Sequence, residues 1–469
     1  MSTTGVIALA RPTFDVDLAE DVAAAAVSVL DEVAPGWIGS RNLLFDAATT
    51  EAAITSFRDA ELDALIVLQV TFTDATMTKT LAAAVDAPLV FWAFPEERTG
   101  GRLRLNSLCG TNLAAFALGQ AGRSLGYLYR APDDPMVGVE IRSLLNVGIA
   151  SPPVESTQLE IEITDEARHS AQRVASVLAS STTGVIGEHP DGFDPCRYEA
   201  DTVRELTGVT IQRVELDDLF SAAEAAPVDD VEAAKFRASR ALGSLDELDQ
   251  QSLDHSLRIY CGLRELATDN GWTGFATRCW PECFTVYGAA ACAPQAMLTD
   301  DGIPGGCEAD AYGTLTSVVL RELANEPPFI ADLVDVDAND DTAVFWHCGV
   351  APLHMADPTV AAGPTVHSNR RKPLLHEFPL KPGRVTIARL SQSGGSHRLV
   401  IGGGEMLRAP LAYGGTAGVV RFDRSAESVL NTIMTEGLEH HYGIVYGDHR
   451  IELRALAEIW QLPIVDLGC

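Results

Sequence analysis

Short apolar runs alternate with longer alanine-rich stretches along the first 130 residues. The short runs have the length and character of buried strands; they are Gly5–Ala10, Ala64–Val70, Pro88–Phe94 and Gly126–Arg130. The stretches between them have helical character; they are Asp17–Leu30, Thr78–Val85 and Asn112–Leu125. Strands that alternate with helices predict right-handed βαβ units. We therefore expect a Rossmann-like, doubly wound α/β domain over residues 1–165.

The alternation resumes after the polar segment Asp133–Thr164, which we expect to link two domains. A strand-like run at Gly184–Gly187 comes first, and helical patterns follow it at Ala200–Leu206, Val231–Leu242 and Leu248–Ala267. This pattern predicts a second doubly wound α/β domain over residues 166–341.

Glycine, proline and β-branched residues become frequent from Thr342 onward. Segments such as Pro382–Ala388 and Leu399–Gly404 have the appearance of short strands joined by glycine turns. A helical pattern at Ile451–Trp460 closes the chain. We expect a C-terminal β-barrel-like domain over residues 342–469.

Composition narrows the class of protein. The chain is 46% hydrophobic, as globular proteins are, and no apolar run is long enough to cross a bilayer. The N-terminus lacks the basic start and long apolar stretch of a secretory signal, and nine cysteines, an odd number, fit a reduced compartment. We therefore expect a cytoplasmic protein without a membrane partner. The net charge of −31 argues against nucleic-acid binding.

Carboxylates stand at two places where structural elements are expected to meet. Glu308 and Asp310 lie in the glycine-flanked segment Gly306–Gly313, just before a helical pattern. Asp332 ends the apolar run Pro328–Ala331. Side chains at such junctions are free to converge on a cleft. Capping of a helix or a turn is the alternative role for Asp310 and Asp332.

Histidines occur in similarly apolar surroundings. His347 follows Phe345 and Trp346, and His440 and His441 precede a strand-like run. A buried core histidine is the alternative for His347, and a polar turn is the alternative for the pair. Separated carboxylates together with histidines suit an octahedral, mostly oxygen-ligated ion, which favours Mn²⁺ over Zn²⁺.

The chain from Trp272 onward resembles the L-fucose isomerase family, which is related in fold to the L-arabinose isomerases. The matching segments are Arg278–Trp280, Cys307–Asp310, Ala331–Asp332, His347–Gly349, Pro382–Thr386 and His441–Gly443 with Gly447. Two intervals match as well: Asp332 follows Glu308 by 24 positions, and Gly447 follows His441 by 6. Two matched intervals far apart in the chain are more specific than either motif alone.

The resemblance implies an aldose–ketose isomerase that binds Mn²⁺ or another divalent ion through Glu308, Asp332 and His441. It also implies that Glu308 and Asp332 are catalytic, moving a proton between C1 and C2 through an ene-diol. His347 is expected to be either a fourth metal ligand or a donor to a sugar hydroxyl. The fold and the metal site can be inferred from the resemblance more readily than the identity of the sugar.

Further substrate contacts follow from the same resemblance. Trp280 and the residues Gln69 and Phe72 are expected to line the sugar site. Arg11, after the first strand, resembles a family arginine that reaches the site of a neighbouring subunit. We therefore expect a homo-oligomer with sites at its subunit interfaces.

The densest basic cluster in this acidic chain contains Arg370, Arg371 and Lys372. It is interpreted either as a solvated loop or as a clamp for an anionic substrate, since arginine matches phosphate, carboxylate and sulfonate groups. Isomerases similar to this family convert sulfoquinovose to sulfofructose, and we expect that reaction here. The alternatives are isomerisation of a neutral sugar such as L-fucose or L-arabinose, and a non-catalytic sugar-binding sensor.

Overall fold

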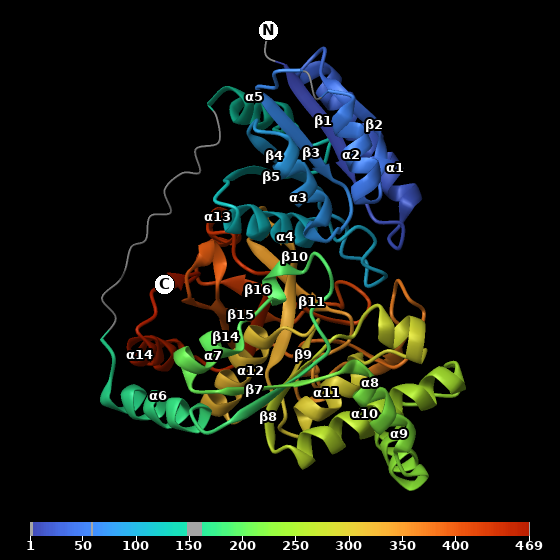
Figure 1. Ribbon diagram of the computed structural model, residues 1–469, viewed down its shortest axis with the longest axis vertical. Coiled ribbons are helices and arrows are strands. Elements are labelled where there is room, and N and C mark those ends of the chain that lie inside the picture. Colours follow the sequence, from blue (N-terminus) through green and yellow to red (C-terminus); the bar gives the residue numbers. More distant parts are fainter. Residues whose placement is uncertain (1–2, 58–59, 148–161, 469) are drawn as a thin grey trace.

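A computed structural model describes residues 3–57, 60–147 and 162–468. Three sheets follow one another along the long axis of the molecule, with the N-terminal sheet at one end and the C-terminal sheet in the middle (Figure 1). No helix among the described residues has the length and apolar character needed to cross a membrane.

The N-terminal sheet has five parallel strands in the order β2-β1-β3-β4-β5. The strands are β1 Thr4–Leu9, β2 Ile38–Leu44, β3 Ala64–Gln69, β4 Leu89–Ala93 and β5 Leu125–Tyr129. The helices are α1 Val16–Val33, α2 Ala47–Thr55, α3 Ala75–Ala84, α4 Ser107–Gln120 and α5 Val137–Val147. Helices α1 and α5 cover the face that carries Val6, whereas α2, α3 and α4 cover the face that carries Ile7. The four predicted strands and the doubly wound arrangement are confirmed.

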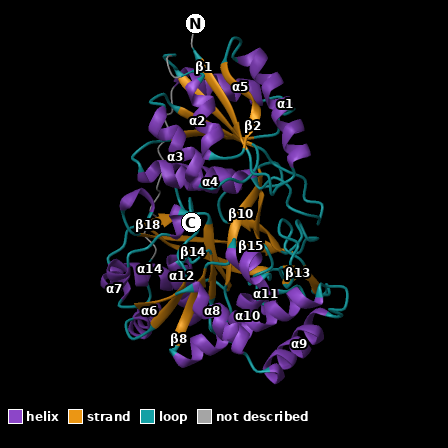
Figure 2. Ribbon diagram, turned by 45° about the vertical axis from the view of Figure 1, so that its right-hand side comes forward, coloured by secondary structure: helices purple, strands orange, loops and turns teal. Residues whose placement is uncertain are grey.

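The second sheet is also parallel, in the order β7-β6-β8-β9. Its strands are β6 Thr182–Ile186, β7 Thr210–Val214, β8 Trp272–Thr277 and β9 Gly305–Cys307. Its helices are α6 Asp165–Leu178, α7 Ala200–Thr207, α8 Leu216–Ala225, α9 Val228–Leu242, α10 Gln250–Asp269, α11 Cys292–Asp300 and α12 Ala311–Ala324. Helices lie on both sides of β8 (Figure 2). Within the predicted link, α5 occupies residues 137–147, and residues 148–161 lie outside the described part of the chain.

The C-terminal sheet is mixed and has nine strands, in the order β12-β13-β16-β11-β10-β17-β14-β15-β18. They are β10 Phe329–Asp337, β11 Thr342–His347, β12 Gly363–Thr365, β13 Leu375–Pro379, β14 Gly383–Ser391, β15 Arg398–Leu407, β16 Thr416–Phe422, β17 His441–Tyr446 and β18 Ile464–Asp466. Helices α13 Ala426–Thr435 and α14 Arg450–Trp460 accompany it.

This sheet stands where we expected a small barrel-like domain. An additional pairing between β15 and β16 joins β16, β11, β10, β17, β14 and β15 into a ring of hydrogen-bonded neighbours. The sheet begins with β10, which is upstream of the expected domain start at residue 342. The three-domain division itself stays a prediction.

Candidate active site

Strand pairing in the C-terminal sheet brings two of the predicted ligands face to face. Asp332 on β10 is directly opposite His441 on β17, and its Oδ1 lies 3.5 Å from the His441 Nε2. Glu308 reaches the same point from the loop after β9, where it adopts a left-handed conformation with φ of 59°. Its Oε2 lies 3.6 Å from the His441 Nε2. The structure therefore brings together Glu308, Asp332 and His441 from two different sheets.

The two carboxylates differ in charge. Burial raises the pKa of Asp332 to about 7, and the neighbouring carboxylates of Glu308 and Asp310 act in the same direction. Burial also opposes the charge of Glu308, but a hydrogen bond from His440 and the nearby histidines outweigh it and lower its pKa to about 2. Near neutral pH, Glu308 is therefore ionised, whereas Asp332 is divided between its protonated and ionised forms.

Two buried atoms that could coordinate a metal ion, Asp332 Oδ1 and His441 Nε2, have no hydrogen-bond partner. Buried polar atoms without a partner are rare in folded proteins, because they lose the hydrogen bonds that water would supply. With the Glu308 carboxylate they form a set of two oxygen ligands and one imidazole. This donor set fits a divalent cation such as Mn²⁺.

His441 is held in the orientation that a metal ligand requires. Its Nδ1 donates to Asp310 Oδ2 over 2.9 Å, which directs Nε2 toward Glu308 and Asp332. Asp310 is in turn held by Arg389, whose Nη2 donates to Oδ1 over 3.0 Å, and both side chains are fully buried. Asp310 also caps α12 by accepting from the Gly313 N–H. The capping alternative is therefore confirmed for Asp310, which also orients His441.

Arg389 was not predicted. It lies on β14 within an apolar strand, where a single buried arginine requires a buried anion. That isolated arginine in an apolar run was the signal available in the sequence.

Asp310→Asn should weaken Mn²⁺ binding about 10- to 100-fold, because an amide no longer enforces the Nδ1–H form of His441 and leaves Arg389 without its counter-ion. Titration calorimetry on the metal-free protein measures this directly. Asp249→Asn is the matched control, since Asp249 likewise caps a helix, α10, and neither lines the pocket nor belongs to the cluster of possible metal ligands. Unchanged affinity in Asp310→Asn, or an equal loss in both variants, would contradict the assignment.

His347 lies beside His441, with 5.6 Å between the ring centroids. Its Nδ1 accepts the N–H of Cys348 over 2.9 Å, and burial lowers its pKa to about 3. A neutral ring whose Nδ1 accepts must carry its proton on Nε2. The Nε2 is buried and has no partner. This hydrogen bond favours a donor to a sugar hydroxyl, whereas the position of His347, with ligand atoms of Asp332, His347 and His441 all within 4.8 Å of one another, is that of a fourth metal ligand. Both expected roles therefore stay predictions.

His440 is closer to the site than the sequence indicated. Its Nε2 lies 3.1 Å from Glu308 Oε2, and burial lowers its pKa to about 4. A carboxylate oxygen only accepts, so the neutral His440 ring donates through Nε2. The adjacent pair of histidines was visible in the sequence, but strand alternation would send neighbouring side chains to opposite faces. Here the two ring centroids lie 4.0 Å apart and both rings face Glu308.

A pocket opens above these groups and contains most of the predicted substrate contacts. Its lining includes Arg11, Phe72, Trp280, Glu308, Asp332, His347 and Arg370. The Arg11 guanidinium lies 4.9 Å from the ring centroid of Trp280 in the same chain and pairs with Asp74 over 3.0 Å. Arg11 therefore lies at the pocket of its own chain, and the expectation that it reaches the site of a neighbouring subunit stays a prediction.

Three predicted contacts do not line the pocket. Gln69 is buried and donates to the Thr71 carbonyl oxygen over 2.7 Å, so it supports the adjoining loop. Lys372 Nζ donates to Ser252 Oγ on α10 over 3.0 Å, and Arg371 is exposed. Arg371 has a left-handed backbone with φ of 58°, and this turn separates the three basic side chains. Of the basic cluster, only Arg370 lines the pocket.

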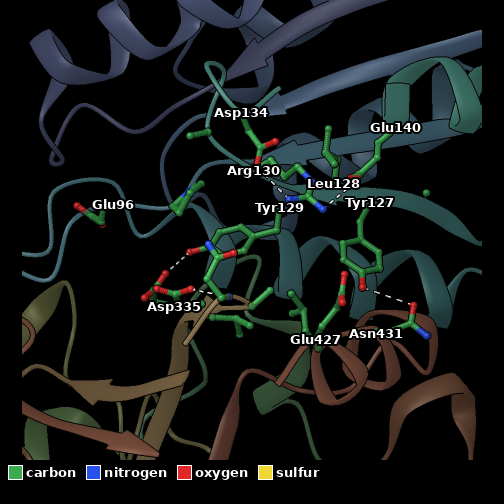
Figure 3. A pocket seen from close by; sticks show the side chains of 18 of the residues that line it. Glu96, Tyr127, Leu128, Tyr129, Arg130, Asp134, Glu140, Asp335, Glu427 and Asn431 are labelled. Carbon is green, nitrogen blue, oxygen red and sulfur yellow. Dashed lines mark hydrogen bonds and ion pairs between the residues drawn. The ribbon is translucent and has the colours of Figure 1, made fainter. Parts of the chain in front are cut away.

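A larger cavity of about 740 Å³ lies elsewhere, between β5, α5, α13 and the turn after β10 (Figure 3). Several of its charged groups are paired with one another. Asp335 accepts from the Tyr129 hydroxyl and from Arg98 Nε, each over 2.6 Å. Arg130 pairs with Asp134 and Glu140. We interpret this region as the joint between the N-terminal and C-terminal sheets, and the smaller pocket of about 100 Å³ as the active site.

Tyr129→Phe should lower the stability of this joint by about 1–3 kcal/mol, because buried Asp335 loses a hydrogen-bond donor. Tyr127→Phe is the matched control, since its hydroxyl makes only a 3.4 Å contact with Asn431. Thermal unfolding should show a lower midpoint for Tyr129→Phe than for Tyr127→Phe. Equal midpoints would mean that the contact with Asp335 does not hold the joint together.

Comparison with known proteins finds similarity to sugar isomerases. Residues 5–147 match the family model described as Fucose/sulfoquinovose isomerase, N-terminal domain, and residues 376–467 match L-fucose isomerase, C-terminal domain. A sulfoquinovose isomerase from Alkalicoccus urumqiensis is 29% identical over 86% of each chain. One from Priestia aryabhattai is 27% identical over 96% of this chain and 97% of its own. One from Clostridium sp. (strain MSTE9) is 28% identical over 96% of each chain.

These matches lie at both ends of the chain, and all of them are to isomerases. They therefore favour an enzyme over a non-catalytic sugar-binding sensor. The chain is an isomerase and belongs to the L-fucose isomerase-like family.

Proposed function

We propose that this enzyme is a divalent-metal-dependent aldose–ketose isomerase that converts sulfoquinovose to sulfofructose. The observation that carries the proposal is the convergence of Glu308, Asp332 and His441, with unpartnered donor atoms, beneath a pocket that also holds two arginines. The name sulfoquinovose isomerase shared by the relatives supports the choice of sugar.

Each residue contributes a distinct part of the chemistry. A divalent ion held by Glu308, Asp332 and His441 supplies Lewis-acid polarisation of the substrate carbonyl when bound. Asp332 faces the same point from β10, opposite His441, and is positioned to remove a proton from one carbon and return it to the next. His347 donates through Nε2 to a sugar hydroxyl and so orients the substrate. Glu308 shares the acid–base role, as the family resemblance implies.

The anionic end of the substrate is recognised by Arg11 and Arg370. Both line the pocket, and Arg370 acts with burial to lower the pKa of Arg11 while Asp74 opposes them. Two guanidinium groups that repel each other are stabilised when an anion lies between them. A sulfonate offers three acceptor oxygens to their planar donors.

Arg370 sits in a loop that is fixed from the N-terminal domain. Arg102 Nη2 donates to Asn369 Oδ1 and to the Thr13 carbonyl oxygen, each over 2.7 Å. These contacts hold the loop near Arg11, so the anion site is assembled within one chain. The homo-oligomer with sites at its subunit interfaces, which the family resemblance implies, stays a prediction.

A substrate screen tests the proposal. The purified enzyme is incubated with Mn²⁺ and a panel of aldoses that includes sulfoquinovose, L-fucose and L-arabinose, and products are identified by NMR. We expect conversion of sulfoquinovose to sulfofructose at the highest kcat/KM. Higher kcat/KM on a neutral sugar would establish the neutral-sugar alternative instead.

A further inference from the structure

A thiol lies beside the carboxylate of Glu308, one of the proposed metal ligands. Cys196 ends the short 3₁₀ turn Asp194–Cys196 and is fully buried. Its Sγ lies 4.0 Å from Glu308 Oε2, and His440 Nε2 lies 3.1 Å from the same oxygen. The ligand atoms of Cys196, Glu308, His440 and His441 all lie within 4.8 Å of one another.

These separations are close to those of a tetrahedral zinc site. Zinc binds sulfur at about 2.3 Å and nitrogen or oxygen at about 2.0–2.2 Å, which places neighbouring ligand atoms about 3.3–3.6 Å apart. The observed 3.1 Å and 4.0 Å require shifts of only a few tenths of an ångström. The set of one thiol, one or two imidazoles and one carboxylate is softer than the Glu308, Asp332 and His441 set.

The protonation states permit such binding. His440 Nδ1 is buried without a partner, so the ring proton can move there when Nε2 becomes a ligand. His441 Nε2 is likewise buried, unpartnered and directed at Glu308. The Cys196 thiol would release its proton to solvent on metal binding. Sulfur is a soft ligand, so this set favours Zn²⁺ over a hard ion such as Mn²⁺.

We propose that Cys196, His440 and Glu308 form a second cation position, selective for thiophilic divalent ions such as Zn²⁺, and that its occupation inhibits the isomerase. Inhibition follows because Glu308 is shared, so an ion on the Cys196 side draws this carboxylate away from Asp332 and His441. The binding claim stands on the geometry alone, whereas the inhibition claim rests on the proposed function.

Cobalt(II) added to the metal-free protein tests the binding claim. We expect a near-ultraviolet thiolate-to-cobalt charge-transfer band in the wild type, its loss in Cys196→Ser and Cys196→Ala, and its retention in Cys348→Ser. Cys348 is the matched control because it lines the same pocket beside His347 but is not part of the cluster. Absence of the band in the wild type, or its persistence in both Cys196 variants, would overturn the second position.

Zinc titration of the Mn²⁺-loaded enzyme tests the inhibition claim. Cys196→Ser should keep its Mn²⁺-dependent activity and should need about tenfold more Zn²⁺, or more, for half-inhibition. Equal sensitivity of the wild type and Cys196→Ser would refute inhibition through this position. If the wild type isomerised no sugar with Mn²⁺, the proposed function would fail, while the cobalt band would still decide whether the position exists.

Discussion

Asp332→Asn is expected to reduce kcat about 10²- to 10⁴-fold, which is the usual contribution of a positioned general base. An amide cannot accept the substrate proton, and it is also a weaker ligand for a divalent ion. Steady-state rates on sulfoquinovose with saturating Mn²⁺ measure the effect on turnover. Titration calorimetry of Mn²⁺ binding to the same variant shows whether the loss of turnover comes from loss of the metal ion.

Folding should survive this change. Burial destabilises the ionised form of Asp332, as its elevated pKa indicates, and repulsion from the nearby carboxylates of Glu308 and Asp310 adds to this effect. Removing the Asp332 carboxylate relieves both effects, so the metal-free variant should unfold at a temperature no lower than the wild type. Asp337→Asn, at the exposed end of the same strand, is the matched control and should keep its activity.

Glu308→Gln and His441→Ala extend the same test. Each removes one ligand of the proposed ion, and each variant should purify without stoichiometric metal. Wild-type activity that survives exhaustive chelation would contradict metal dependence altogether. Activity retained by Asp332→Asn alone would leave the metal site intact and move the base to Glu308.

The strands could be predicted where burial is uniform. Leu65 to Leu68 are fully or almost fully buried, so β3 is a continuous apolar run that sequence reveals. Strand β2, Ile38–Leu44, was missed because it is an edge strand whose residues are mostly exposed, so neither a run nor a strict alternation marks it.

Contacts between distant segments were harder to predict than the ligands themselves. The intervals from Glu308 to Asp332 and from His441 to Gly447 indicated the metal ligands, and the structure places these ligands together. The bond from Arg389 to Asp310 joins residues 79 positions apart, and no local pattern specifies such a partner. The orientation of basic side chains around Arg371 depends on one left-handed residue, which composition does not show.

Arg370→Ala should lower kcat/KM on sulfoquinovose about tenfold to a hundredfold. A hydrogen bond to a charged group is worth about 1.5–3 kcal/mol, and the loss affects binding and positioning of the sulfonate, not the proton transfer itself. A neutral aldose never uses this contact, so its kcat/KM should stay nearly constant. Rates on sulfoquinovose and on a neutral aldose, measured side by side, give the comparison.

Arg371→Ala is the matched control for this prediction. It removes the same side chain from the neighbouring position, which is exposed and does not line the pocket. Its kcat/KM should be unchanged on both sugars. Equal losses on both sugars in Arg370→Ala would show that Arg370 supports the loop, because only a structural defect acts regardless of the substrate's charge. No loss on sulfoquinovose would leave Arg11 as the residue that recognises the anion, and Arg11→Ala would then carry the selective loss.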